Sequence, residues 1–314
     1  MSTPCPAALR GIALEAARGV APALAAAFRT PGTAAETKTN HHDLVTVHDR
    51  ATEEALVAAL TTAVPGSTVL GEETGCTGAE GRTGADGPGV VRWIVDPIDG
   101  TSNFSHGFAM FSVSVAAEVH GQVVAGVVLS PVDGLEFSAD STGAWLGRIP
   151  LPRRPAPAGG ERSLNLVTSY PAAEALDREG PSAAERFAHL VQAHATVRRT
   201  VSGALELAYV AAGWADVALL VDTNPWDVAA GQLLVARAGG TLVGADDAGP
   251  APDTPAHLAR HLLAVGPGRR APTAAAVLTE LTRVRASTGP RGTMAGTGAV
   301  PGATGPITDP GRPR

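Results

Sequence analysis

Lysine and cysteine are almost absent from this chain. Among its 314 residues there is one lysine, Lys38, and there are two cysteines, Cys5 and Cys76. Neither cysteine belongs to a CxxC pair or to a Cys/His cluster, which excludes a disulfide framework and makes the cytoplasm the expected location. The lone lysine has two equally good explanations. It is a chance survivor on a loop, or it marks a place where the planar guanidinium of arginine does not fit.

Long apolar runs and clusters of basic residues are also missing. Residues 21–28 are apolar, but arginines flank them and the run is too short to span a membrane. The first residues contain no basic segment followed by a continuous apolar one, so we expect no signal peptide and no membrane association. The net charge of −6, the pI near 5.8 and the lack of a basic stripe predict that nucleic acid is not a partner.

The first half of the chain has the pattern of an α+β unit. Apolar spacing and turn residues predict helices over residues 7–29 and 50–63, the second with Asp49 as its N-cap. A short strand over 67–70 precedes a polar, Gly-rich loop over 75–89 that we expect to be mobile. Strands are further predicted over residues 90–95, 111–119 and 122–129.

The second half alternates strands with helices, which favours α/β layering. The pattern predicts strands over 164–168, 217–221 and 241–243 and helices over 183–193, 203–212 and 226–238. A Pro/Arg/Gly segment separates the halves, so we expect units at 1–148 and 163–285 joined by a linker at 149–162. The last residues, 286–314, are poor in core-forming side chains and predict a disordered tail without a catalytic role.

Acidic residues gather where predicted elements meet. Glu72 follows a short strand, Asp96 and Asp99 follow the strongest strand, and Asp227 opens a helix. Each alone is explained by turn or capping chemistry. Together they suggest a magnesium site, because Mg²⁺ prefers several carboxylate oxygens from separate segments. The turn containing Pro97 would point Asp96 and Asp99 to the same side.

These residues resemble the inositol monophosphatase family. The similar segments are 71–73 (GEE), 93–104 (WIVDPIDGTSNF) and 226–231 (WDVAAG), supported by Lys38, 43–46 (DLVT), Asp49, 211–213 (AAG), Asp216 and 238–240 (AGG). The resemblance covers roughly residues 7 to 267 in the correct order. It implies an α/β fold, the layered αβαβα sandwich of sugar phosphatases, with a metal site between its halves. It also implies a homodimer.

The resemblance assigns roles to individual residues. It implies a first Mg²⁺ on Glu72, Asp96 and the backbone carbonyl of Ile98, a second on Asp96, Asp99 and Asp227, and a weaker third ion near Glu72. The implied catalytic residues are Glu72, Thr101 and Asp99, with Glu72 and Thr101 positioning the attacking water. The implied phosphate and substrate contacts are Gly100, Thr101, Ser102, Lys38, Ser202 and Asp222.

One position departs from the family pattern. Inositol-directed members carry a glutamate seven residues before the aspartate of the Trp-Asp motif, where this chain has Leu220. An apolar side chain cannot replace its hydrogen bonds to ring hydroxyls, although Asp222, Thr223 or Asn224 could reach in instead. The sequence therefore predicts a Mg²⁺-dependent phosphatase for a small phosphate monoester, with inositol, cyclitol or sugar phosphates first. Histidinol phosphate, 3′-phosphoadenosine 5′-phosphate and a non-catalytic binding role are the alternatives.

Overall fold

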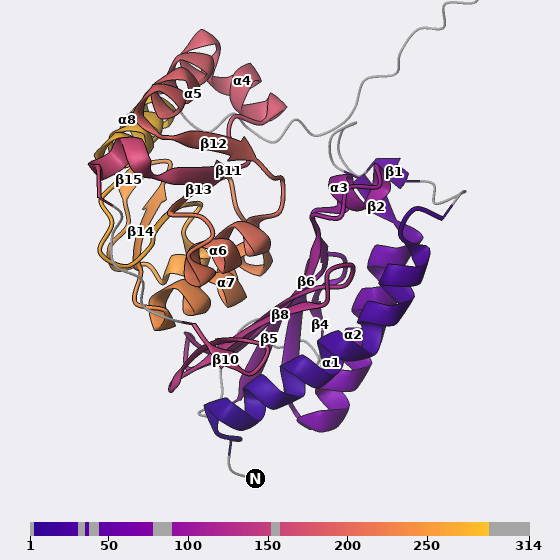
Figure 1. Cartoon of the computed structure of the whole chain (residues 1–314). Coiled ribbons are helices and arrows are strands. Elements are labelled where there is room, and N and C mark those ends of the chain that lie inside the picture. The colour runs from indigo at the N-terminus through magenta and orange to yellow at the C-terminus, as the bar shows by residue number, and fades with distance from the viewer. Residues whose placement is uncertain (1–2, 31–34, 38–43, 78–89, 152–157, 289–314) are drawn as a thin grey trace, which may run out of the picture.

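The structure, a computed structural model, describes residues 3–30, 35–37, 44–77, 90–151 and 158–288 (Figure 1). Lys38 and most of the predicted Gly-rich loop therefore lie outside the described residues, as do residues 152–157 of the predicted linker and residues 289–314 of the predicted tail.

The N-terminal half combines helices with an eight-stranded sheet of order β10-β9-β8-β7-β6-β5-β3-β4 (Figure 1). Strand β3 pairs with β5 in parallel, and the other neighbours are antiparallel. A separate pair, β1 with β2, is antiparallel. The elements are α1 (Pro6–Ala27), β1 (Ala35–Thr37), β2 (Leu44–Thr46), α2 (Val47–Ala63), β3 (Thr68–Gly71), β4 (Gly75–Thr77), β5 (Val91–Asp99), α3 (Thr101–Ser105), β6 (Ser112–Val119), β7 (Gln122–Ser130), β8 (Leu135–Asp140), β9 (Gly143–Leu146) and β10 (Ile149–Pro150).

The C-terminal half holds a six-stranded sheet of order β12-β11-β13-β16-β14-β15. Strands β12, β11 and β13 are parallel to one another, and the remaining pairs are antiparallel. The elements are η1 (Gly160–Ser163), β11 (Asn165–Thr168), α4 (Ala173–Glu179), α5 (Pro181–Ala193), β12 (Thr196–Arg199), α6 (Gly203–Ala212), β13 (Val217–Val221), α7 (Pro225–Arg237), β14 (Thr241–Asp246), β15 (Gly249–Pro250), η2 (Ala256–Leu258), β16 (His261–Val265) and α8 (Pro272–Thr288).

The two sheets and three helical layers alternate across the molecule (Figure 1). Helices α1 and α2 cover the outer face of the first sheet, α6 and α7 lie between the sheets, and α5 and α8 cover the outer face of the second. The largest core cluster is this middle layer, where both sheets pack against α6 and α7. The αβαβα sandwich that the resemblance implied is confirmed.

Burial on both faces explains why the middle of β5, from Trp93 to Val95, is apolar at every position. Val91, Trp93 and Val95 pack under α1 and α2, whereas Ile94 points into the middle layer. Successive side chains of a strand alternate between faces, so a strand covered on both sides needs apolar residues at every position.

Several element predictions differ from the structure; strands β8, β9, β12 and β16 and helix α4, for example, were not predicted. Helix α2 begins at Val47, so Asp49 lies in its first turn and is not its N-cap. The predicted loop begins with a strand, because Gly75–Thr77 pairs with β3 as the sheet edge. Helix α8 was not predicted, and it runs into the first residues of the expected tail. Its apolar residues are spread among alanines and threonines, which weakens the helical pattern.

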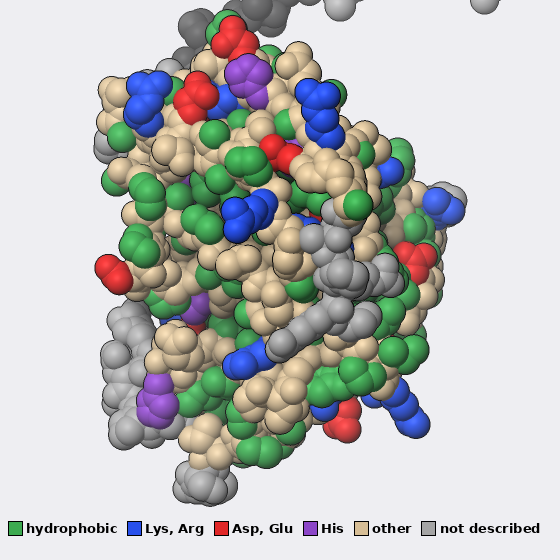
Figure 2. Space-filling model, turned by 60° about the vertical axis from the view of Figure 1, so that its left-hand side comes forward, with side chains coloured by type: hydrophobic (Ala, Val, Ile, Leu, Met, Phe, Trp, Pro, Cys, Tyr) green, Lys and Arg blue, Asp and Glu red, His purple; other side chains and the backbone are tan. Residues whose placement is uncertain are grey.

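The surface shows no obvious region of one charge on the face that Figure 2 displays, where acidic and basic side chains are interspersed. Among the residues that the structure describes, no helix combines the length and the apolar character that crossing a bilayer requires.

Close packing between β7 and α7 yields a stability prediction. A Cβ atom on Gly126 would lie 2.9 Å from the Ala230 Cα and 3.0 Å from its carbonyl oxygen, both backbone atoms that cannot turn aside. We expect Gly126→Ala to lower the free energy of unfolding by about 1–3 kcal/mol, measured by urea denaturation. Gly19→Ala is the matched control, because its added methyl meets nothing within 4 Å and should stabilise α1 by about 0.5–1 kcal/mol. Equal stability of Gly126→Ala and the unmodified protein would contradict this packing.

Candidate metal and phosphate site

Asp96 and Asp99 project to the same side because the strand that carries them is bulged. Asp96 pairs with Ser114 and Asp99 with Ser112, so β5 has one more residue than β6 over this interval. Residues three apart on a regular strand face opposite sides, and a single extra residue restores them to one side. The expected turn around Pro97 is thus a β-bulge, and its predicted effect on the two carboxylates is present.

A third carboxylate, from a distant part of the chain, joins these two at the bulge. One oxygen each from Asp96, Asp99 and Asp227 lies within 4.8 Å of the other two. Asp227 reaches the cluster from the first turn of α7, where its Oδ2 accepts the backbone N–H of Asn224 at 2.7 Å. Asp96 Oδ1 accepts the N–H of Ile98 at 3.0 Å. These backbone bonds fix each carboxylate by one oxygen only.

Asp99 is bound by donors from both halves of the protein. From β6 the Ser112 hydroxyl donates to Oδ2 at 3.2 Å. From the start of α6 the Ser202 hydroxyl donates to Oδ2, the Gly203 N–H donates to Oδ1 at 3.0 Å, and the Ala204 N–H donates to Oδ2 at 3.1 Å. Asp99 therefore satisfies backbone donors that a helix N-terminus leaves without partners.

Glu72 belongs to the same cluster, and a buried glutamate holds the loop that carries it. The Glu53 carboxylate, on α2, accepts the backbone N–H groups of Glu73 and Thr74, each at 2.9 Å. A Cβ atom on Gly71 would lie only 2.4 Å from Glu53 Oε1, so this contact requires glycine at position 71. Glu53 thereby positions the residue next to Glu72.

The Thr101 hydroxyl lies between a carboxylate and a carbonyl. Its Oγ1 is 3.0 Å from Asp49 Oδ1 and 3.0 Å from the Ile98 carbonyl oxygen. Asp49 is buried and points from the first turn of α2 toward α3. Gly100 precedes Thr101 with a φ of 93°, a left-handed conformation that glycine adopts without strain. Asp49, which was predicted as the N-cap of α2, is thus a partner of Thr101.

Burial and mutual repulsion dominate the electrostatics of the cluster. Burial raises the pKa of Asp96 well above its usual range, and the charges of Glu72, Asp99 and Asp227 raise it further. Burial raises the pKa of Asp99 to about 6 in spite of its four donors. Burial also raises the pKa of Asp227 to about 8, with contributions from Asp99 and Glu72. Converging carboxylates whose ionised forms are disfavoured make a cation site.

Of the other predicted substrate contacts, some lie at the cluster and some do not. Ser102 lies beside Thr101 in α3, and Ser202 reaches the cluster through Asp99. Leu220 is buried among the residues of the middle layer. Asp222 is not brought to the cluster, because its Oδ1 accepts hydrogen bonds from Arg260 and Arg285, each at 2.6 Å.

Sequence reasoning missed two buried glutamates, although a signal existed for the first. Asp49, Glu53, Leu56 and Leu60 share one buried stripe of α2, and an acid on such a stripe points to a partner inside the protein.

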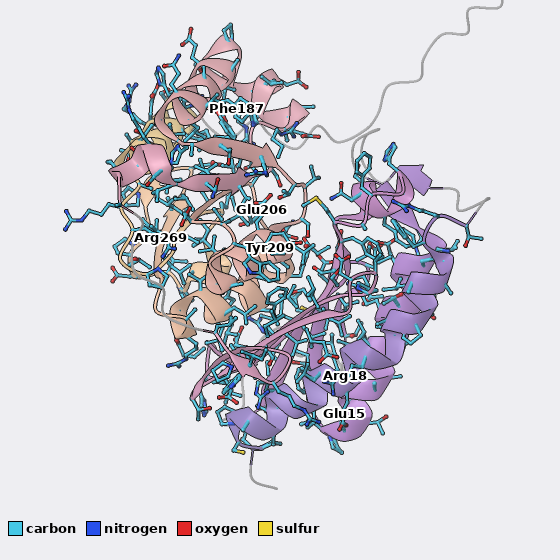
Figure 3. The ribbon with its side chains drawn as sticks, viewed as in Figure 1. Glu15, Arg18, Phe187, Glu206, Tyr209 and Arg269 are labelled. Atoms are coloured by element: carbon cyan, nitrogen blue, oxygen red, sulfur yellow. The ribbon has the colours of Figure 1, made fainter. Side chains whose placement is uncertain are left out.

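The second buried glutamate, Glu206 on α6, lies toward the space between the halves in Figure 3. Its Oε1 accepts the hydroxyls of Ser169 at 3.0 Å and Thr200 at 2.7 Å. Burial raises its pKa to about 8.

The donor set fits Mg²⁺. The cluster offers hard oxygen ligands from two elements, β5 and α7, and Asp96 and Asp227 each keep one oxygen that no backbone N–H binds. Burial and repulsion disfavour all three negative charges. A bound divalent cation would offset this repulsion and so stabilise the folded protein.

The raised pKa values predict how pH affects the metal-free protein. The folded chain keeps a proton on Asp99 up to about pH 6 and on Asp227 up to about pH 8, whereas the unfolded chain releases both near pH 4. The free energy of unfolding therefore falls as pH rises through this window. In EDTA at pH 8 we expect Asp227→Asn to be more stable than the unmodified protein by about 1–3 kcal/mol, with little difference at pH 4, in thermal unfolding. Asp253→Asn, at an exposed loop position, is the control. Lower stability of Asp227→Asn at pH 8 would argue against repulsion within the cluster.

Proteins similar in sequence to this chain are named either Nus factor SuhB or inositol-1-monophosphatase. The Nus factor SuhB of Pseudomonas aeruginosa is 37% identical over 235 residues, covering 74% of this chain and 83% of that protein. The inositol-1-monophosphatase of Mesorhizobium japonicum is 37% identical over 199 residues, covering 63% and 71%. Because several relatives are named Nus factors, the expected absence of a nucleic-acid partner has no support from them.

Solved structures agree with this relationship. The extragenic suppressor protein suhB of Bartonella henselae superposes with a TM-score of 0.71 at 27% identity, covering 88% of this chain and 98% of that one. The Thermotoga maritima IMPase superposes with a TM-score of 0.70 at 26% identity, covering 87% and 97%. The sequence profile of the inositol monophosphatase family matches residues 6–283. This chain therefore belongs to the inositol monophosphatase family, whose members act on small phosphorylated compounds and generally depend on Mg²⁺.

Proposed function

We propose that this protein is a Mg²⁺-dependent phosphatase that hydrolyses a small phosphate monoester. The observation that carries the proposal is the convergence of the Asp96, Asp99 and Asp227 carboxylates, with Glu72 beside them and the Thr101–Asp49 pair on the adjoining elements. Glu72, Asp96, Asp99, Asp227 and the carbonyl of Ile98 would hold two or three ions. Bound Mg²⁺ would lower the pKa of a coordinated water and neutralise charge on the phosphate.

The Thr101–Asp49 pair supplies the proton path for the attacking water. A threonine hydroxyl has one hydrogen to donate and two lone pairs to accept with. When its hydrogen goes to Asp49 Oδ1, the Thr101 oxygen is left to accept a hydrogen from water. As the water attacks phosphorus, its proton passes to Thr101 and the Thr101 proton passes to Asp49. The ester P–O bond breaks, and the leaving alkoxide takes up a proton from solvent water. No nucleophilic serine or cysteine is needed.

Leu220 bears on the substrate. Its side chain is buried in the middle layer and offers no hydrogen bond to a polyol, which disfavours myo-inositol phosphate itself. We rank cyclitol and sugar phosphates first, and histidinol phosphate or 3′-phosphoadenosine 5′-phosphate second. A homodimer stays a prediction from the resemblance. A binding or regulatory role without turnover is the second candidate function, and the relatives named Nus factor SuhB are the observation that favours it.

Phosphate release from a panel of esters tests the proposal. The panel contains inositol 1-phosphate, several sugar phosphates, histidinol phosphate and 3′-phosphoadenosine 5′-phosphate, each with Mg²⁺ and with EDTA. We expect turnover of at least one ester with Mg²⁺, none with EDTA, and none by an Asp99→Asn variant whose melting temperature shows that it is folded. If no ester is turned over under any condition, the phosphatase proposal fails and the non-catalytic role is favoured.

The proton path makes a second prediction. Thr101→Ala should lower kcat by about 10²–10⁴, the usual contribution of general acid–base groups, whereas Thr101→Ser keeps the hydroxyl and should retain most activity. Asp49→Asn preserves a carbonyl acceptor for the Thr101 hydroxyl but cannot take up the proton, so kcat should fall while Mg²⁺ affinity is kept. Steady-state kinetics and a Mg²⁺ titration separate the two effects. A Thr101→Ala enzyme with unaltered kcat would show that the hydroxyl has no role in the reaction.

A further inference from the structure

A cavity of about 360 Å³ lies at the C-terminal ends of β11 and β13, outside the carboxylate cluster. Ser169 and Tyr170 follow β11, Val221 and Asp222 lie at the end of β13, and Ala172 and Ala175 of the α4 region complete an apolar part of the wall. The volume is in the lower part of the range of small-molecule sites, about 300–1,000 Å³.

The topology of the sheet favours a ligand at this place. Strands β11 and β13 are parallel neighbours, but the chain leaves β11 for α4 and α5 on the outer side and leaves β13 for α7 in the middle layer. Adjacent parallel strands whose connections diverge to opposite faces leave a crevice beyond their carboxyl ends, and ligands of open α/β sheets bind in such crevices.

Arg178 brings unused hydrogen-bond donors to the cavity wall. Its Nη1 is 3.7 Å from Asp222 Oδ1 and 3.8 Å from Asp247 Oδ1, and within the described part of the chain its guanidinium makes no hydrogen bond. Arg260, which also lines the cavity, is bound more tightly, at 2.6 Å from Asp222 and 3.0 Å from Asp247. A guanidinium has five donors, so Arg178 can bind an oxyanion through two of them.

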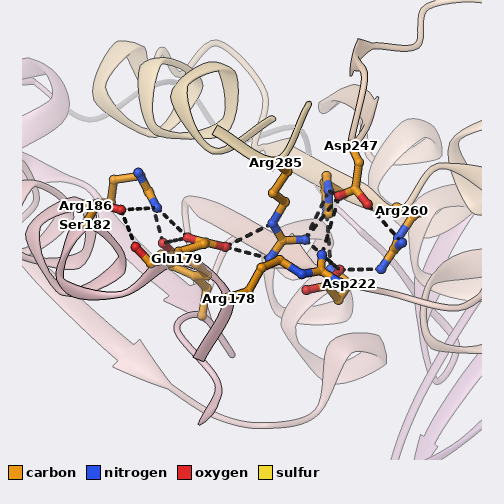
Figure 4. A network of polar contacts seen from close by, with 10 residues as sticks. Arg178, Glu179, Ser182, Arg186, Asp222, Asp247, Arg260 and Arg285 are labelled. Carbon is orange, nitrogen blue, oxygen red and sulfur yellow. Dashed lines mark hydrogen bonds and ion pairs between the residues drawn. The ribbon is translucent and has the colours of Figure 1, made fainter. Parts of the chain in front are cut away.

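The backbone that presents Arg178 is held firmly. The next residue, Glu179, accepts hydrogen bonds from Arg285 Nη2 at 2.7 Å, Arg186 Nη2 at 2.5 Å and the Tyr170 hydroxyl at 2.7 Å (Figure 4). All four of these side chains are buried, and together they tie the end of α4 to α5, α8 and β11. A ligand would therefore meet an arginine whose backbone is already fixed, which reduces the entropy lost on binding.

The same neighbourhood is unsuited to a metal ion. Asp222, Asp247 and His261 approach within 4.8 Å of one another, but arginines already neutralise both carboxylates. His261 Nδ1 accepts the Asp222 N–H at 3.2 Å, which leaves its Nε2 to donate to Asp247 Oδ1 at 3.1 Å. Glu174, the other acid on the wall, has a partner of its own in the structure. A cation would have to displace guanidinium groups, whereas an oxyanion would use a donor that is free.

We propose that this cavity binds an oxyanion group, a carboxylate or a phosphate, of a small metabolite, with Arg178 as its principal ligand and Arg260 as the second. The oxyanion comes from the far end of the substrate or from a separate molecule. The cavity and the carboxylate cluster lie on either side of the end of β13, because Leu220 packs in the middle layer and Val221 packs on the outer side.

Binding to the metal-free protein tests this proposal without relying on catalysis. In EDTA the carboxylate cluster has no cation through which to bind an anion, so calorimetric titration with inorganic phosphate and with succinate reports on the arginine cavity. We expect at least one probe to bind with a Kd in the millimolar range or lower, and Arg178→Gln to raise that Kd by about tenfold. Arg237→Gln, an exposed arginine at the end of α7, is the control and should bind as the unmodified protein does.

A second variant guards against a structural effect of the first. Ala172→Leu fills the cavity without changing any charge, and it should weaken binding of the same probe. Both variants, Arg178→Gln and Ala172→Leu, should keep the melting temperature of the unmodified protein. Equal binding by Arg178→Gln and the unmodified protein overturns the proposal, as does the failure of both probes to bind.

Kinetics with Mg²⁺ distinguishes the two sources of the oxyanion. If the oxyanion belongs to the substrate, Arg178→Gln raises KM for a phosphate ester that carries a second acidic group and leaves KM unchanged for a neutral sugar phosphate. If it belongs to a separate molecule, both KM values are unchanged, and succinate alters the rate of the unmodified enzyme but not that of Arg178→Gln. The kinetic experiment rests on the proposed phosphatase activity, whereas the calorimetric experiment tests anion binding whether or not the protein is a phosphatase.

Discussion

The carboxylate of Asp99 joins the two halves of the molecule. One of its donors comes from β6 in the first sheet, and three come from the residues that begin α6 in the second half. Helix α6 packs against α7, which carries Asp227, so the residue that completes the cluster is positioned by the helix that Asp99 caps. Assembly of the sandwich and assembly of the site are therefore a single event.

Two acidic clusters in this protein illustrate opposite solutions to the burial of charge. Around Asp222 and Asp247, arginines supply the counter-charge and the carboxyl pKa values are lowered, chiefly by hydrogen bonds and charges that outweigh burial. Around Asp96, Asp99 and Asp227 the described partners are neutral donors and other acids, and the pKa values are raised. The two clusters thus have opposite preferences, one for cations and the other, which presents a spare guanidinium, for anions.

Much of the fold and most of the cluster could be predicted because the signals lie within short segments. The long segment around Asp96 and Asp99 specified both the family and the αβαβα layers, and it placed two ligands three residues apart. The partnership of Asp49 with Thr101 joins residues 52 positions apart, and the contact of Glu53 with Thr74 depends on how α2 crosses the first sheet. Asp222 was expected at the site because it is close to Asp227 in the chain, but the end of β13 turns it toward Arg285. Lys38 lies outside the described residues, so its two explanations stand as before.

The pairing of Leu220 with Gly203 limits how such a protein can change its preference for substrates during evolution. A Cβ atom at position 203 would meet Leu220 Cδ2 at 3.1 Å and the Asp227 carbonyl oxygen at 3.4 Å, so the leucine occupies room that the glycine provides. A lineage that replaced Leu220 with an acid would place a new charge beside the cluster and remove the apolar contact of Leu220 with α6. A lineage that first enlarged position 203 would press on Leu220 and on the backbone of α7. The viable routes between leucine and glutamate at position 220 therefore pass through coordinated replacements at both positions.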